Sequence, residues 1–380
     1  MNRPLSNTSA EAHLSHTIVR FIIIIVLVMC APYMVGSSEL CGVHQKSHIR
    51  DVPWFQGAWG VRVALPAGNQ GKISKRFFGG SLLDQLLSLK TNHWVMLNLT
   101  APSFGGLFTA RVKEVSDVLG DQAQPPVDLL DHYVNRLKKA GYRVILYVAA
   151  QGPSLEFLGD RKDSFFLRLP KRKAKILSSV DQQWNSYLTK MGKRANGDKE
   201  FAKLISAYSR KFGAKIDGWW FDHGVHARPE ILIPAARIGN KNVIVAWNGR
   251  KKFVKLDSHW LWPLERTTLL ADFTDGHVSP TSKNGKGVEP WWFGNHNLIE
   301  QVVYCDRISG ALPHVFIPLQ STWRGGKNIF PSDLAVRWTK EVIKASGAIT
   351  WAAALRSPEF SRAEIAPRVY RVLQRIDSSF

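Results

Sequence analysis

The sequence predicts an α/β fold, most economically a (β/α)₈ TIM barrel preceded by an N-terminal signal or anchor segment. From about residue 50 onward, strand-like and helix-like segments alternate about eight times with short links. In addition, 45% of the 380 residues are hydrophobic, which allows a large core. A doubly wound open sheet is the competing architecture, although no Gly-x-Gly-x-x-Gly follows the first strand. No Ser/Gly-rich linker divides residues 50–380, so we expect one domain there.

Residues 1–38 have the pattern of a secretory signal peptide or signal anchor. Arg20 precedes the apolar run FIIIIVLVMCAPYMV (21–35), and small residues follow it. This run of about 15 residues is short for a transmembrane helix, which needs about 20. We therefore expect export to the periplasm or the extracellular space, with membrane association through residues 18–36 as the alternative.

Each predicted strand is an apolar run, as is typical of buried parallel strands. The expected strands are residues 58–65, 93–99, 142–150, 216–222, 242–247, 267–273, 313–320 and 347–354. The helices between them have apolar residues at helical spacing, and one ends with Lys138, Lys139 and Gly141, as helix C-termini prefer. The expected helices are residues 79–90, 127–141, 201–213, 331–347 and 363–376.

The net charge and the cysteine content limit which ligands, partners and disulfides the sequence allows. The formal net charge is +21, with basic clusters at 161–175 and 249–255. Such charge attracts polyanions such as sulfated or uronic glycans, although a generally basic surface explains it equally well. Nucleic acid is disfavoured because no zinc-finger, Walker or RNP-like pattern is present. Cys41 and Cys305 allow at most one disulfide, whose formation the sequence leaves open, and no metal or cofactor is expected.

The segment KIDGWWFDHGVH (215–226) carries the main functional signal. An aromatic run ends in Asp222, which is either a turn carboxylate or a catalytic group at the mouth of a barrel. Other polar and aromatic residues follow the neighbouring strands; they are His223, Trp247, Asn248, Arg250, Asp275 and His277. Glycoside cleavage needs such a set, because one carboxylate attacks the anomeric carbon while a second carboxyl group, held protonated, donates a proton to the leaving oxygen.

The segment AYSRKFGAKIDGWWFDHG (207–224) resembles the nucleophile strand of alpha-L-fucosidases, glycoside hydrolase family 29. The segments VIVAWNGR (243–250), ADFTDGHVSP (271–280) with PWW (290–292), and WFQGAWGVRV (54–63) are similar to other segments of that family. The resemblance implies an exported, retaining glycoside hydrolase that acts on fucosylated or acidic glycans. It also implies that Asp222 is the nucleophile and that Trp220 and Arg250 line the sugar pocket.

The chain departs from this family after the first two strands. It has LPAG (65–68) and LTAPSFGG (99–106) where the family carries sugar-binding histidines, and it has no Glu in ADFTDGHVSP. Asp275 and Glu289 are therefore both candidates for the general acid. The expected substrate-binding residues are Trp220, His223, Trp247, Asn248, Arg250, His277 and Trp291. Two alternatives stay open: a catalytically inactive glycan-binding barrel, and a membrane-anchored protein with a basic docking surface.

Overall fold

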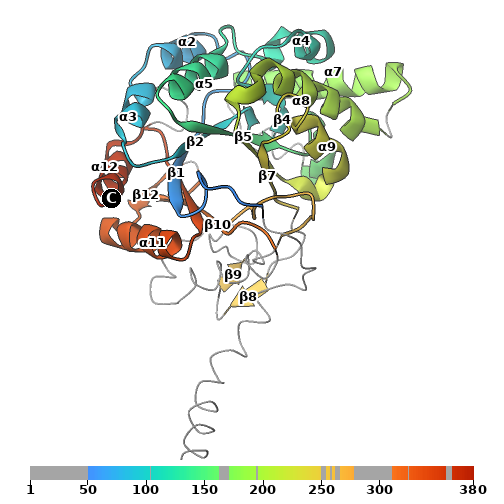
Figure 1. Ribbon diagram of the computed structural model, residues 1–380. Coiled ribbons are helices and arrows are strands. Elements are labelled where there is room, and N and C mark those ends of the chain that lie inside the picture. The colour runs from blue at the N-terminus through green and yellow to red at the C-terminus, as the bar shows by residue number, and fades with distance from the viewer. Residues whose placement is uncertain are drawn as a thin grey trace, which may run out of the picture. The chain divides into compact units, whose positions relative to one another are not determined.

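The computed structural model describes residues 50–102, 104–161, 171–193, 196–249, 254–256, 259–261, 266–277, 310–323, 325–356 and 362–380. Residues Val43–Phe380 form one compact unit, built around a curved sheet of seven parallel strands (Figure 1). The strands of this sheet are β1 (Ala58–Val63), β2 (Trp94–Asn98), β5 (Arg143–Ala149), β6 (Gly218–Asp222), β7 (Ile244–Trp247), β10 (His314–Pro318) and β13 (Ala348–Ala352).

Helices form the outer layer of the unit, with α2 beside α5, α8 beside α9 and α11 beside α12 (Figure 1). The helices are α2 (Lys72–Phe78), α3 (Leu82–Ser88), α4 (Lys113–Leu119), α5 (Leu129–Lys139), α7 (Lys171–Lys190), α8 (Gly197–Phe212), α9 (Pro229–Ala236), α11 (Ser332–Lys344) and α12 (Pro367–Asp377). Short 3₁₀ turns are η2 (Asp121–Ala123), η3 (Glu156–Arg161), η5 (Gly213–Lys215) and η6 (Gly224–His226). Two-stranded ribbons are β3 (Thr100–Ala101) with β4 (Phe104–Phe108), β8 (Val254–Leu256) with β9 (His259–Leu261), and β11 (Gln320–Thr322) with β12 (Gly325–Ile329).

The order of the strands decides between the two predicted architectures. The sheet runs β10-β13-β1-β2-β5-β6-β7, so the strands follow the chain order around a circle, with the last strand, β13, beside the first, β1, and with β7 and β10 at the two edges. A doubly wound sheet instead reverses its strand order at a switch point. The predicted α/β class is therefore confirmed, and the curled parallel sheet is compatible with the predicted TIM barrel.

The segment 267–273, predicted as the sixth strand, contains no regular strand. It makes isolated parallel bridges instead, with Phe273 paired both to Ala246 of β7 and to Leu312 ahead of β10. The reason lies in Asp272, whose carboxylate accepts hydrogen bonds from Val245 N (2.8 Å) and from the guanidinium of Arg237 (2.7 Å). The carboxylate of Asp272 thus accepts the backbone N–H of Val245, which a backbone carbonyl would accept in a regular sheet. The segment nevertheless lies between β7 and β10, the two edge strands of the sheet.

Alternation along the strands divides each one into an inner and an outer face. Inside the curve of the sheet, Trp220 stacks on Tyr147 with ring centroids 5.3 Å apart and meets Phe316 edge-on at 5.0 Å. Trp219 and Phe221 lie on the other face of β6, and both are buried as well. The strands are apolar on both faces because each face is covered, which explains the continuous apolar runs in the sequence.

A chain of buried polar groups joins the inner core to residues 267–277. We call these residues the bridging segment, because they form isolated bridges to β7, to β10 and to Leu312 ahead of β10. The indole of Trp94 donates to Thr350 Oγ1 (3.0 Å), and that hydroxyl lies 2.8 Å from His314 Nε2. His314 Nδ1 donates to the carbonyl of Thr274 (3.1 Å), so Nε2 accepts from Thr350 and the ring is neutral. Burial lowers the pKa of His314 to about 3, which keeps it neutral at ordinary pH. This ring fastens the bridging segment to β10.

The sequence did not predict α7, because its basic residues obscure an apolar stripe at helical spacing. Leu177, Val180, Trp184 and Leu188 are the buried members of that stripe. Within the described residues, no helix is both long enough and apolar enough to cross a membrane. The predicted signal or anchor segment 1–38, including residues 18–36, lies outside the described residues, as do Cys41 and Cys305.

Gly60→Ala is expected to destabilise the protein by about 1–3 kcal/mol, because a Cβ at this position in β1 would overlap the indole ring of Trp94 inside a closely packed core. Gly79→Ala is the matched control, since a Cβ there meets no atom within 4 Å. Urea unfolding of both variants, followed by tryptophan fluorescence, measures the free energy of unfolding. Equal stability of the two variants would contradict this account of the core.

Candidate active site

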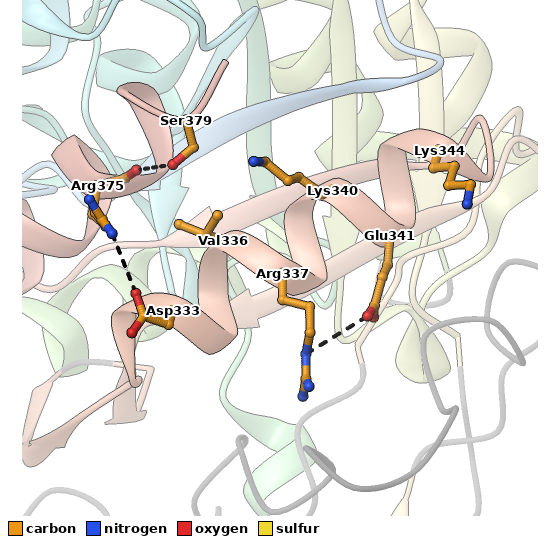
Figure 2. A pocket seen from close by; sticks show the side chains of 8 residues that line it. All are labelled: Asp333, Val336, Arg337, Lys340, Glu341, Lys344, Arg375 and Ser379. Atoms are coloured by element: carbon orange, nitrogen blue, oxygen red, sulfur yellow. Dashed lines mark hydrogen bonds and ion pairs between the residues drawn. The ribbon is translucent and has the colours of Figure 1, made fainter.

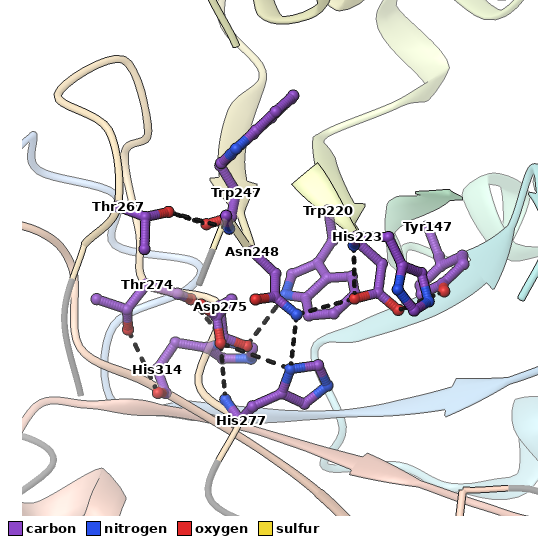
Figure 3. A network of polar contacts seen from close by, with 12 residues as sticks. Tyr147, Trp220, His223, Trp247, Asn248, Thr267, Thr274, Asp275, His277 and His314 are labelled. Atoms are coloured by element: carbon purple, nitrogen blue, oxygen red, sulfur yellow. Dashed lines mark hydrogen bonds and ion pairs between the residues drawn. The ribbon is translucent and has the colours of Figure 1, made fainter. Parts of the chain in front are cut away.

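Asp222 is the last residue of β6, and its carboxylate takes part in a polar network with Tyr147, His223 and Asn248, three residues that are labelled in Figure 3. The Tyr147 hydroxyl donates to Oδ2 (2.6 Å), and the Asn248 amide donates to Oδ1 (2.9 Å). Oδ1 also accepts from the backbone N–H of His223 (2.9 Å), whose Nε2 lies 3.3 Å from Oδ2. The side chain of Asp222 keeps 14% of its surface exposed. It is therefore held by donors from both neighbouring strands, unlike a carboxylate that only closes a turn.

Strand register brings these groups together. In the parallel pair β5–β6, Tyr147 is opposite Trp220 and Ala149 is opposite Asp222. Residues two apart share a face, so the phenol of Tyr147 lies on the face that carries Asp222. On the other side, Asn248 follows β7, and its backbone N–H donates to Phe221 O (2.8 Å), which sets it beside the end of β6.

Opposing effects act on the Asp222 carboxyl. Burial raises its pKa, but the positive charges of His223 and His277 and the hydrogen bonds from Tyr147 and Asn248 together outweigh burial. The net result is a pKa below the ordinary value of an aspartate. Asp222 is therefore an ionised carboxylate at neutral pH, as a nucleophile must be.

His277 is the second titratable group of the network. Asn248 Nδ2, which donates to Asp222, lies 3.1 Å from His277 Nδ1, so one amide group bridges the two side chains. When Nδ1 accepts from this amide, the proton of the neutral ring is on Nε2. The Asp275 carboxylate lies 3.7 Å from the same Nδ1, within reach of a protonated ring. Phe316, Trp220 and Trp323 surround the imidazole with ring centroids 4.8–5.5 Å away.

Several predicted residues have positions that differ from the expectation. Trp220 was expected to line the sugar pocket, but its ring is fully buried and its Nε1 donates to the carbonyl of Asp275 (3.1 Å). Trp247 is only 3% exposed and packs against Phe221. Asp275, expected as a general acid, has a side chain with no exposed surface. These three side chains are buried, so contact with a substrate is open to the more exposed His223 and His277.

Three predicted residues, Arg250, Glu289 and Trp291, lie outside the described residues. Tyr147 was not predicted, because it lies in an apolar strand and only the register with β6 brings its hydroxyl to Asp222. The sequence marks Tyr147 only as a residue with a polar hydroxyl near the end of the apolar run YRVILYVAA (142–150).

The rest of the described structure offers little competing chemistry. No group of three or more His, Cys, Asp or Glu side chains in the described ranges is placed to hold a metal ion. A hollow of about 490 Å³ lies on the outer face along α11 and the end of α12 (Figure 2). Four of its charged side chains form two pairs, Arg375 with Asp333 (3.8 Å) and Arg337 with Glu341 (3.8 Å), and it contains no member of the Asp222 network.

Comparison with solved structures shows the fold. The endo-fucoidan hydrolase P5AFcnA from glycoside hydrolase family 107 is 18% identical, with a TM-score of 0.68 over 86% of this chain and 91% of that chain. The endo-fucoidan hydrolase MfFcnA4, from the same glycoside hydrolase family, is also 18% identical, with a TM-score of 0.64 over 86% of this chain and 53% of that chain. The alpha-L-fucosidase AlfC from Lactobacillus casei is 11% identical, with a TM-score of 0.46 over 84% of this chain and 94% of that chain. No curated protein matches the chain.

Comparison with protein families refines the resemblance seen in the sequence. The model of the endo-alpha(1,4)-fucoidanase Mef1 matches residues 49–380. The expectation of a fucose-related glycoside hydrolase is thereby confirmed, while the family is a fucoidanase family and not that of the alpha-L-fucosidases. Because the matched region spans most of the sequence, the chain belongs to the family of the endo-alpha(1,4)-fucoidanase Mef1.

Proposed function

We propose that the protein is a retaining endo-hydrolase of sulfated fucan polysaccharides, with Asp222 as the nucleophile and His277 as the general acid and base. The observation that carries the proposal is that one amide, that of Asn248, joins an ionised carboxylate to an imidazole at the ends of adjacent strands. The family supports the substrate class. The formal charge of +21 supports an anionic polymer.

The sheet and the bridging segment fit a closed (β/α)₈ barrel. Phe273 pairs with β7 on one side and with Leu312 on the other, which gives the sheet an eighth member between its two edges. In such a barrel the catalytic groups follow the C-terminal ends of several strands. Tyr147, Asp222 and Asn248 lie near or just after the ends of three consecutive strands of this sheet.

In the first step, an Asp222 oxygen attacks the anomeric carbon while the bond to the leaving sugar breaks. The leaving oxygen takes a proton from protonated His277, and a glycosyl ester forms on Asp222. In the second step, His277 takes a proton from water, the water oxygen attacks the anomeric carbon, and Asp222 is released. The configuration is retained because the carbon is inverted twice.

Asp275 has a different role in this proposal from the one expected for it. Its buried carboxylate accepts the backbone N–H of His277 (3.0 Å) and lies near Nδ1 of the ring. We assign it to holding His277 and stabilising its protonated form. Glu289, the other expected acid, lies outside the described residues.

Export of the protein through residues 1–38 is part of the same proposal. Its support is the sequence pattern alone, together with the size of a polysaccharide substrate. N-terminal sequencing of the protein recovered from the culture medium or periplasm tests it.

Asp222→Asn is expected to lower kcat on sulfated fucan by on the order of 10⁴-fold or more, because an amide cannot form the glycosyl ester. Asp117→Asn is the control, since Asp117 is an exposed partner of Lys113. Reducing-end release measures the rate, and early-time NMR of the products reads the anomeric configuration. Full activity of Asp222→Asn, or products with inverted anomeric configuration, contradicts the mechanism. Glycan binding without turnover by the unaltered protein indicates the alternative, a catalytically inactive glycan-binding barrel.

Tyr147→Phe is expected to move the acid limb of the kcat/KM profile upward by roughly half to one pH unit. The phenol stabilises ionised Asp222, so its removal raises the pKa of that carboxyl. The unaltered enzyme should lose activity only as the pH falls through the lowered pKa, below the ordinary aspartate range near 4. Tyr187→Phe, which removes a hydroxyl bonded to Glu200, should leave the limb in place.

His277→Asn is expected to lower kcat on the polysaccharide by about 10²–10⁴-fold, because a poor leaving oxygen needs the proton. Fucan oligosaccharides that carry a nitrophenol leaving group should show a much smaller loss of the glycosylation rate, which pre-steady-state nitrophenol release measures. His132→Asn, on the outer helix α5, is the control. Equal losses on both substrates would show that His277 only maintains the structure.

A further inference from the structure

A second hollow lies beside the proposed catalytic network. Its volume is about 350 Å³, within the range of small-ligand sites. Its walls come from the loop after β5, from α7, from the start of α8 and from the segment that follows Asp222. Trp184 and Phe201 form an apolar part of the wall, and the remainder is mostly polar.

Backbone pairing places this hollow next to Asp222. Ala150 N donates to Asp222 O (2.7 Å), and Gln151, the next residue, lines the hollow. On the other side of Asp222, His226 and Arg228 reach the same hollow from the chain just after η6. A polymer bound across Asp222 would therefore pass close to this hollow.

Gln151 is the feature that points to a ligand. It lines the hollow, yet both atoms of its amide group are buried and have no hydrogen-bond partner in the described part of the chain. A buried amide without partners is costly, so a structural role does not explain it. Rotation of the side chain into the hollow would let the amide donate to one hydroxyl of a sugar and accept from another.

The charges around the hollow select the kind of sugar. Its described lining includes the carboxylates of Glu156 and Asp198 and a single guanidinium, that of Arg228. Arg228 already pairs with Asp198 (2.9 Å), which leaves Glu156 to repel an anion. A sulfate ester placed here would meet the like charges of Glu156 and Asp198, whereas hydroxyl groups would meet donors and acceptors.

We propose that the hollow formed by Gln151, Glu156, Trp184, Asp198 and Arg228 is a subsite for an unsulfated sugar unit of the polysaccharide, next to the cleaved bond. This inference rests on the proposed function, because the occupant is a unit of the same polymer. It adds a specificity: cleavage requires a unit free of sulfate at this position, even though the polymer as a whole is anionic.

The test uses Gln151→Leu in the full chain, with Gln182→Leu as the matched control on an exposed position of α7 outside the hollow. Gln151→Leu should bind chemically desulfated fucan oligosaccharides about tenfold more weakly by calorimetry, because two hydrogen bonds to the ligand are lost. Without ligand, it should unfold at the same temperature as the unaltered protein or higher, because a buried unpaired amide has been removed. Unchanged affinity, or a lower unfolding temperature, overturns the proposal.

Glu156→Gln tests the selection against sulfate. At low ionic strength, removal of this charge should tighten the binding of sulfated fucan oligosaccharides by about two- to fivefold and change that of desulfated ones by a smaller factor. Equal effects on both ligands, or none, would contradict the claim that the subsite takes an unsulfated unit.

All binding is measured in the Asp222→Asn background, which prevents turnover. If the unaltered enzyme releases no product, or Asp222→Asn keeps its rate, the proposed function fails, whereas loss of the Gln151 effect alone disproves only the subsite.

Discussion

The hydrogen bonds to the Asp222 carboxylate are the constraint on which the candidate site depends. Tyr147 comes from β5 and Asn248 from the end of β7, and Asp222 ends the strand between them. A shift of one residue in either pairing would turn the phenol or the amide to the opposite face of the sheet. The parallel ladders on both sides of β6 therefore fix the chemistry of the site as well as the fold.

The sequence was sufficient to locate the ends of β6 and β7, and so the candidate residues beside them. Asp222, Asn248 and His277 were predicted from their places after apolar runs, and the structure brings them into one network. Contacts between strands could not be read, because the register of parallel strands depends on packing and not on local sequence. Tyr147 was missed for this reason, and the burial of Trp220 was missed because both faces of β6 are apolar.

The sixth strand marks another limit of prediction from sequence. The run TTLLADF (267–273) has the apolar character of a strand, but Asp272 bonds through its side chain to β7, and regular pairing is reduced to isolated bridges. What holds this segment is polar: the neutral His314 ring donates to Thr274, and Asp275 accepts the backbone N–H of His277. The residue proposed to carry the proton is therefore positioned by buried hydrogen bonds that no periodic pattern reveals.

Charge balance gives a reason for a histidine, and not a second carboxyl, as the proton carrier. With Asp222 ionised and His277 protonated, the pair has no net charge, and after glycosyl transfer the ester and the neutral ring again have none. A pair of carboxyl groups would instead keep one negative charge in both states. In a site of low dielectric, an unbalanced charge is costly, and a negative one would also repel the sulfates of the substrate. The nearby carboxylate of Asp275 suits this exchange, because it lies 3.7 Å from Nδ1 of His277 and stabilises the ring in its protonated form.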